Sequence, residues 1–103
     1  MIFLKIDIAN NIKTVELLKV ELMQKLTDLF GDIAAETDFE SLNRLTDDAA
    51  GIINIAYILA MRLGVDLDDL NSAMKQKLIY EIRNNHYIER RYGDLSELYK
   101  KLG

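Results

Sequence analysis

The sequence lacks three residue types altogether: its 103 residues include no cysteine, no proline and no tryptophan. It also has only five glycines and one histidine. The absence of cysteine excludes disulfide scaffolds, thiolate metal sites and cysteine nucleophiles. Because helix breakers are so few, the chain favours long helices over many turns, and we expect an all-α protein. Its length fits a single domain, residues 1–103, since domains usually have roughly 100 to 200 residues.

Charge and hydropathy exclude two classes of partner. The net charge is −4, with six basic and 13 acidic side chains in residues 1–71 and seven basic and four acidic in residues 72–103. Such a chain does not resemble a duplex-DNA binder, whose pI usually exceeds about 9. The longest apolar stretch, residues 49–61, contains 13 residues, fewer than the roughly 20 that span a bilayer. Residues 1–10 lack the basic segment and cleavage site of a secretory signal, so we expect a cytoplasmic protein with no membrane contact.

The first half of the chain predicts two long helices. Residues 1–9 alternate apolar and polar side chains, which fits a short strand, an extended lead-in or the start of a helix. From Ile12 to Phe30 apolar side chains recur every three or four residues, and Gly31 is a suitable stop. A second helix is expected from about Asp38 to Leu63, because Thr37 and Glu40 have the spacing of a capping box and Gly64 follows.

The second half predicts one more long helix and a short one. Asp66 is a good N-cap, and Asp68 and Asp69 in the first turn suit the positive end of the helix dipole. This helix should continue to about Tyr92, and after Gly93 a short C-terminal helix should begin at Asp94.

The second helix is apolar around nearly its whole circumference between residues 49 and 60. A helix of this kind must be buried on all sides. Two other long helices of a small chain do not easily surround it, so we expect a second copy to cover the rest. The expected architecture is a helical bundle whose four-helix core is completed by dimerisation.

Polar residues inside this apolar helix are the main candidates for chemistry. Asp47 and Asp48 stand at the start of the apolar run and Asn54 lies inside it. Two interpretations are open: exposed aspartates with Asn54 fixing the register of a dimer, or a site for a hard cation such as Mg²⁺, which prefers carboxylates and substrate phosphates. In the second interpretation Glu21 on the first helix faces the two aspartates.

The segment from Asp47 to Leu70, D-D-A-A-G-I-I-N-I-A-Y and then A-M-R-L-G-V-D-L-D-D-L, resembles the core of the all-α NTP pyrophosphohydrolases, the MazG-like superfamily. Members typically carry E-x-x-E on one helix and E-x-x-D on the next, followed by an apolar run that ends in R-L-G-[IV]-D-L. Lys77 and the E-R-R-Y-G stretch at residues 89–93 are similar to the family's ending. The resemblance covers about residues 12–92.

The resemblance implies a helical dimer or tetramer that uses Mg²⁺ or Mn²⁺ to cleave a nucleoside triphosphate to the monophosphate and pyrophosphate. It implies that Glu21 and Asp48 are catalytic metal ligands and that Asp47 is a supporting ligand. Further residues implied to bind the nucleotide phosphates are Lys77, Arg83 and Arg90.

Two positions depart from the family pattern. Leu18 replaces the first glutamate of E-x-x-E, and Gly51 falls where E-x-x-D has its aspartate. The sequence therefore leaves two hypotheses open. The chain is either a metal-dependent pyrophosphohydrolase or a non-catalytic helical dimer that serves as a protein-interaction or nucleotide-sensing module.

Overall fold

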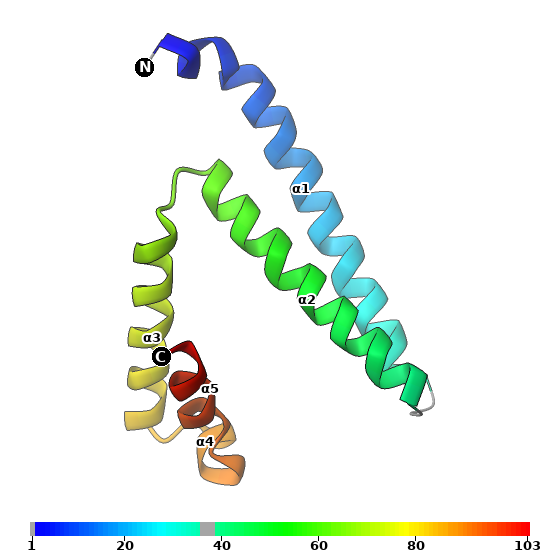
Figure 1. The fold of residues 1–103 in the computed structure, drawn as a ribbon, viewed down its shortest axis with the longest axis vertical. Helices are drawn as coiled ribbons and strands as arrows, with labels where there is room; N and C mark the ends of the chain where they lie inside the picture. Colours follow the sequence, from blue (N-terminus) through cyan, green and yellow to red (C-terminus); the bar gives the residue numbers. More distant parts are fainter. Residues whose placement is uncertain (1, 36–38) are drawn as a thin grey trace. The chain divides into compact units, whose positions relative to one another are not determined.

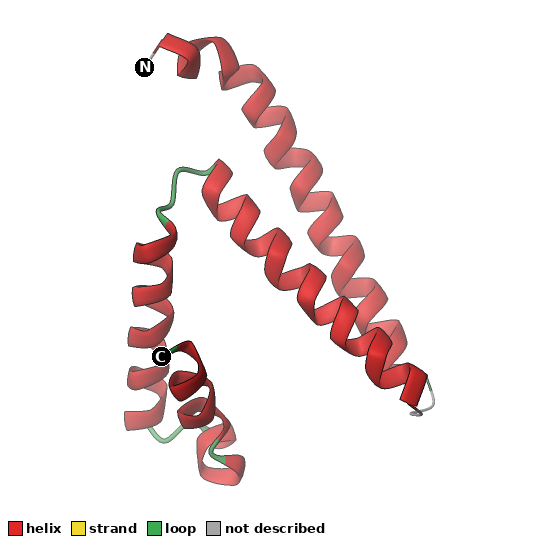
Figure 2. Cartoon of the chain, in the orientation of Figure 1, coloured by secondary structure: helices red, strands yellow, loops and turns green. Residues whose placement is uncertain are grey.

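A computed structural model describes residues 2–35 and 39–103, with side chains from residue 10 to 35 and from residue 40 onward. Over these ranges the regular structure is entirely helical, which confirms the all-α expectation (Figures 1 and 2). The helices are α1 (Ile2–Ala34), α2 (Phe39–Arg62), α3 (Leu67–Arg83), α4 (Tyr87–Tyr92) and α5 (Asp94–Leu102). Among the described residues, no helix has the length and apolar character needed to cross a membrane.

The helices form two compact units, Met1–Gly64 and Val65–Gly103. The first unit is an antiparallel hairpin of α1 and α2. Near its open end Asn11 Nδ2 donates a hydrogen bond to the carbonyl oxygen of Arg62 at 3.0 Å. Near its closed end Arg44 Nε lies 3.9 Å from Asp32 Oδ1. These two contacts fix which residues of α1 and α2 face each other. The expectation that the whole chain is a single domain stays a prediction.

Helix α1 is longer at both ends than the sequence suggested. It begins at Ile2, so of the alternatives for residues 1–9 the start of a helix is the one observed from residue 2 on, and the strand-like or extended lead-in is wrong there. A lone strand would leave its backbone groups unpaired, whereas a helix satisfies them internally. The helix also continues through Gly31 to Ala34, because glycine costs a helix interior only about 0.5–1 kcal/mol. The capping box at Thr37 lies outside the described residues.

The second unit packs α5 against α3 and α4, with Leu78 buried at 7% exposure. Asp66 caps α3 as expected, accepting hydrogen bonds from the backbone N–H groups of Asp68 at 2.8 Å and Asp69 at 3.1 Å. The expected helix to Tyr92 is wrong, because α3 stops at Arg83. Asn85 then takes a left-handed conformation with φ 60°, which asparagine tolerates better than most residues.

His86 starts α4 by accepting a hydrogen bond from the Ile88 N–H on its Nδ1 at 3.1 Å. Gly93 ends α4 at φ 69° and provides no side chain to cap α5. Glu89 supplies the missing cap, because its carboxylate accepts from the Ser96 N–H at 3.1 Å and from the Ser96 hydroxyl. These hydrogen bonds lower the pKa of Glu89.

Two glycines provide a matched test of this fold. Gly93→Ala should lower the free energy of unfolding by about 1–2 kcal/mol, because a Cβ is strained at positive φ. Gly31→Ala lies within α1, where a Cβ would meet nothing within 4 Å, and should raise it by about 0.5–1 kcal/mol. Urea unfolding followed by circular dichroism at 222 nm measures both, and equal effects of the two substitutions would contradict the assigned conformations.

Candidate functional site

The predicted metal ligand Glu21 is half exposed on α1 and is engaged within its own helix. Its Oε1 lies 4.0 Å from Lys25 Nζ, one turn further along α1. Glu21 is also seven residues from Asp28, which is about 10 Å along a helix axis. Asp28 is close enough to Asp48 for its charge to raise the pKa of Asp48. Glu21 is therefore about two helical turns away from Asp48 along the hairpin.

Gly51 stands where the family pattern has an aspartate. The Lys25 side chain of α1 lies next to the position that a side chain at residue 51 would take. A Cβ built at Gly51 would lie 3.6 Å from both Cδ and Nζ of Lys25 and 3.9 Å from Cε. These are ordinary van der Waals separations, so the stem of Lys25 crosses α2 at this glycine. The remaining departure, Leu18, is half-buried on α1.

Asp48 faces two aspartates of α1 that the sequence analysis did not single out. One oxygen of its carboxyl group, Oδ2, is enclosed and receives no hydrogen bond from a donor group. A hydrogen bond with the Asp32 side chain raises the pKa of Asp48, as do desolvation and the charges of Asp32, Asp28 and Asp47. Two ionised carboxylates have no hydrogen to share. A proton on Asp48 makes the hydrogen bond possible, because the resulting hydroxyl can donate to the Asp32 carboxylate. Asp47, the predicted supporting ligand, is exposed.

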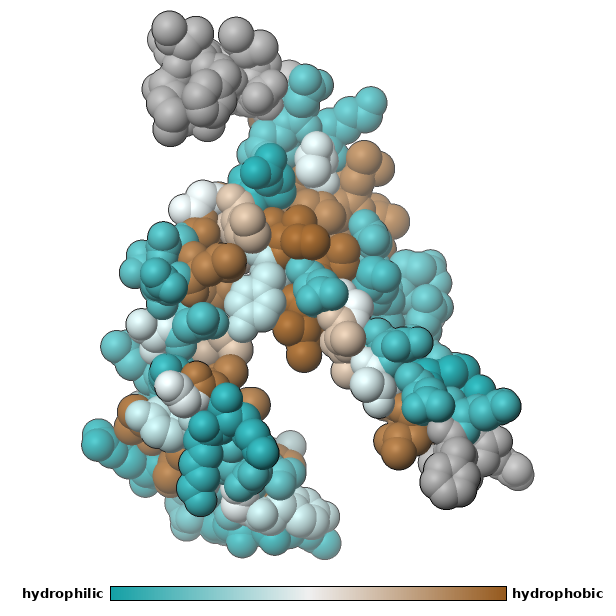
Figure 3. All heavy atoms as spheres, viewed as in Figure 1, coloured by the Kyte–Doolittle hydropathy of each residue, from teal (hydrophilic) through white to brown (hydrophobic). Residues whose placement is uncertain are grey.

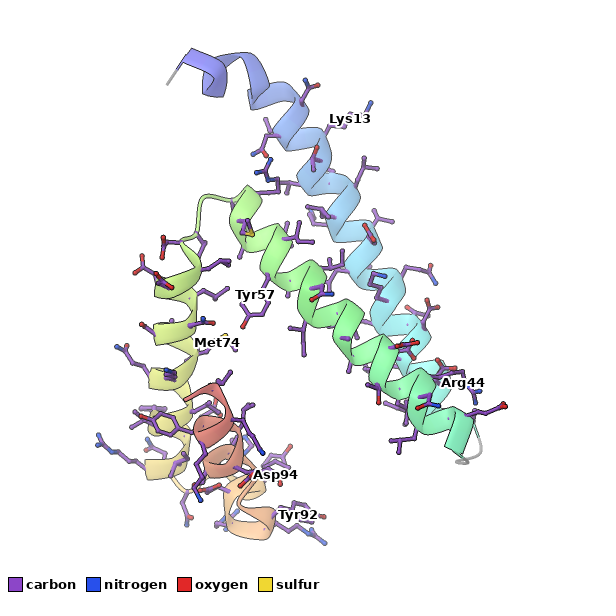
Figure 4. All side chains as sticks on the ribbon, in the orientation of Figure 1. Lys13, Arg44, Tyr57, Met74, Tyr92 and Asp94 are labelled. Atoms are coloured by element: carbon purple, nitrogen blue, oxygen red, sulfur yellow. The ribbon has the colours of Figure 1, made fainter. Side chains whose placement is uncertain are left out.

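One cation, Arg44, lies beside these carboxylates, and a second, Lys25, pairs with Glu21 instead. Arg44 pairs with Asp32 and also donates to the Ser41 hydroxyl at 3.0 Å, and Figure 4 shows it near the start of α2. Lys25 pairs with Glu21, which lies one turn further from the closed end of the hairpin. Within the described ranges, the structure does not gather three aspartate, glutamate or histidine side chains into a group that could hold a metal ion. The residues present therefore do not fit the four-carboxylate Mg²⁺ site that the family pattern implies.

Asp28, Asp32 and Lys25 were missed because their importance depends on the register of α1 against α2. Their spacing was a usable signal, since residues 25, 28 and 32 are three and four apart and share one helix face. Their position opposite residues 48 and 51, however, follows from the register of α1 against α2, which periodicity does not supply.

The three predicted phosphate contacts are distributed over two helices. Lys77 lines an open depression on α3 together with Ala73, Gln76, Tyr80 and Glu81. Arg83 is the last residue of α3, Arg90 belongs to α4, and both are exposed. Neither arginine lines the depression beside Lys77, and a shared phosphate-binding role for the three stays a prediction.

The raised pKa of Asp48 gives a pH test with a defined sign. Because the pKa in the folded state lies above the ordinary value of 3.8, folding favours the protonated form. This stabilisation is complete below about pH 3.8 and is lost as the pH rises through the folded-state pKa. Asp48→Asn should remove this component, so the variant gains stability relative to wild type as the pH rises.

The measurement is urea unfolding between pH 3 and pH 7, with the difference between variant and wild type plotted against pH. Asp47→Asn is the control, because Asp47 is exposed on the same helix and its charge contributes least to the raised pKa of Asp48. Parallel curves for Asp48→Asn and wild type would contradict the assignment.

Comparison with known proteins gives one match. No curated protein and no solved structure matches the chain significantly. A family model, described as the MazG-like family, matches residues 8–95. This range begins within α1, covers the rest of the hairpin and extends into the start of α5. The chain therefore belongs to the MazG-like family.

Proposed function

We propose that this chain is a non-hydrolytic helical module that assembles with a second copy of itself. The observation that carries the proposal is an uncharged stripe on the side of α2 that does not face α1. Its residues follow one another at alternating spacings of four and three, the pattern of a helix that packs along another helix. We call it the α2 seam: Leu42, Thr46, Ala49, Ile53, Ala56 and Ala60.

The α2 seam is open in this chain. Five of its six residues are exposed, including Leu42 at 62% and Ile53 at 54%, and Ala60 is half-buried. The three alanines allow a second backbone to approach closely. Because the stripe carries no charge, two copies related by a two-fold axis meet without like-charge repulsion. The α2 seam therefore suits a second α2 as its partner.

The hairpin unit also exposes many large apolar side chains. Eleven of them are 44–67% exposed. A monomeric protein rarely exposes patches of more than a few hundred Å², and a standard interface buries about 800 Å² on each partner. Figure 3 shows apolar surface gathered over the middle of the hairpin. Completion of the core by a second copy accounts for this surface.

The non-hydrolytic part of the proposal is supported by the separation of the predicted ligands. Glu21 is engaged by Lys25, Asp48 is engaged by Asp32, and Gly51 has no carboxylate. Metal-dependent cleavage of a polyphosphate needs carboxylates that converge on the cation. The described side chains do not provide this convergence.

A second function, Mg²⁺-dependent hydrolysis of a nucleoside triphosphate, is favoured by one observation. Asp48 Oδ2 is enclosed without a donor, and Asp48 contacts Asp32. One or two carboxylates together with substrate phosphates commonly hold Mg²⁺.

Assembly is tested by sedimentation velocity. The wild type should be a dimer at micromolar concentration, and Ile53→Glu should weaken the dimer at least about 100-fold in Kd, because the interface would bury two unpaired carboxylates. Asn54→Glu is the matched control, since residue 54 is exposed next to the seam but about 100° around the helix. A monomeric wild type would refute the proposal, and dissociation by both variants would place the interface at Asn54 instead.

Hydrolysis is tested by ³¹P NMR of the wild type with Mg²⁺ or Mn²⁺ and a panel of canonical and modified nucleoside triphosphates. We expect the spectra to stay unchanged over hours. Monophosphate and pyrophosphate that disappear in Asp48→Asn, with the dimer intact, would establish the second function instead. Thermal melts with the same nucleotides test the sensing role, because a ligand specific to the folded state raises Tm.

A further inference from the structure

Helix α4 exposes a set of side chains that its role in the fold does not explain. The structure describes all six of its residues, and two of them are half-buried: Ile88 and Glu89, whose carboxylate accepts hydrogen bonds from Ser96. The other four are exposed, and each is a tyrosine or an arginine: Tyr87, Arg90, Arg91 and Tyr92. The solvent side of α4 therefore has two aromatic rings and two positive charges, with no aliphatic side chain and no carboxylate.

Both tyrosine rings of α4 have a partner on one side only. The Tyr87 ring stacks on His86, with ring centroids 4.5 Å apart and an interplanar angle of 27°. His86 is itself held in place, because its Nδ1 accepts a hydrogen bond from the Ile88 N–H. Arg91 Cζ lies 5.8 Å from the centroid of the Tyr92 ring. Since Tyr87 is still 62% exposed and Tyr92 65%, each ring keeps a face on which another planar group can stack.

The two arginines flank Tyr87 on the helix surface. Arg90 and Arg91 follow it by three and four positions, which places their side chains next to Tyr87 on one helix face. Within the described part of the chain, neither arginine forms an ion pair, so both guanidinium groups are available to an anion. Glu89 is engaged at Ser96. The acidic residues that follow belong to the first turn of α5, where the positive end of the helix dipole favours them.

From this arrangement we infer that the solvent side of α4 binds single-stranded nucleic acid. Proteins that bind such strands without sequence preference combine aromatic side chains, on which bases stack, with cations that contact the phosphates. Tyr87 and Tyr92 are about 7.5 Å apart along the helix axis and about 140° around it, so their rings do not enclose the same base. This spacing favours a strand over a single nucleotide.

A protein partner fits the solvent side of α4 less well. Protein interfaces have an apolar core, and this side of α4 offers no exposed aliphatic residue to form one. The inference does not depend on assembly through the α2 seam, because α4 belongs to the other compact unit.

The test measures fluorescence anisotropy of end-labelled 12-mers of oligouridine and oligothymidine with the full chain. We expect a Kd of about 1–100 µM in 50 mM NaCl. Two phosphate contacts to a single strand give a salt slope near −1.4, so affinity should fall about sevenfold between 50 and 200 mM NaCl. Binding of either strand supports the inference, and a preference between them identifies RNA or DNA as the source.

Variants of α4 assign the binding to its rings and guanidinium groups. Tyr87→Ala should weaken binding at least about fivefold, whereas Tyr87→Phe keeps the ring and should bind like wild type. Arg90→Gln combined with Arg91→Gln should remove most of the salt dependence. Tyr80→Ala is the matched control, because Tyr80 is 68% exposed on α3. Circular dichroism checks that each variant is folded.

No change in anisotropy at about 200 µM protein would overturn the inference, and so would equal losses in Tyr87→Ala and Tyr80→Ala. Unlabelled competitors test the class of ligand. Uridine monophosphate that displaces the strand as well as an unlabelled 12-mer, at equal nucleotide concentration, would show a site for single nucleotides instead. Equally effective displacement by polyglutamate would show a site for an acidic protein segment. If Tyr87→Ala does not fold, Tyr92→Ala at the other end of α4 takes its place with the same expected loss.

Discussion

The first unit depends on one constraint: a two-helix hairpin buries a single face of each helix. Ile55 and Ser41 are buried in this unit, whereas many other apolar side chains of both helices are exposed. The hairpin therefore has an inner face, where charged groups must find partners, and an outer face, where apolar groups lack them. The candidate chemistry and the proposed assembly arise from these two faces separately.

Near the closed end of the hairpin, the inner face brings several carboxylates close together. Asp28, Asp32 and Asp48 lie close enough to repel one another, and desolvation adds to the cost of keeping Asp48 ionised. Like charges in contact need a counter-ion or a proton. The chain has Arg44 at Asp32 and a raised pKa that favours a proton on Asp48. A divalent metal is another solution to the same repulsion, which explains why carboxylates alone do not identify a metal site.

The features that the sequence predicted correctly are those with local causes. The Asp66 cap and the stops at Gly64 and Gly93 depend on a few neighbouring residues. The apolar pattern of α2 is likewise a property of one segment of the sequence. The stop predicted at Gly31 was wrong because glycine permits a stop without requiring one. The break at Asn85 was missed because asparagine is compatible with both helix and turn. The partners of Asp48 were missed because they depend on interhelical register, which no local pattern encodes.

Membership of the MazG-like family and its expected chemistry rest on different residues. The family match extends over residues 8–95, whereas the metal site depends on four positions, of which Leu18 and Gly51 are altered. These changes cost the hairpin little, because leucine suits the apolar contact of α1 and glycine leaves room for the stem of Lys25. An aspartate at position 51 would lie in contact with the side chain of Lys25. The missing carboxylate and the position of Lys25 are therefore linked by packing, because the glycine leaves the room that the lysine stem occupies.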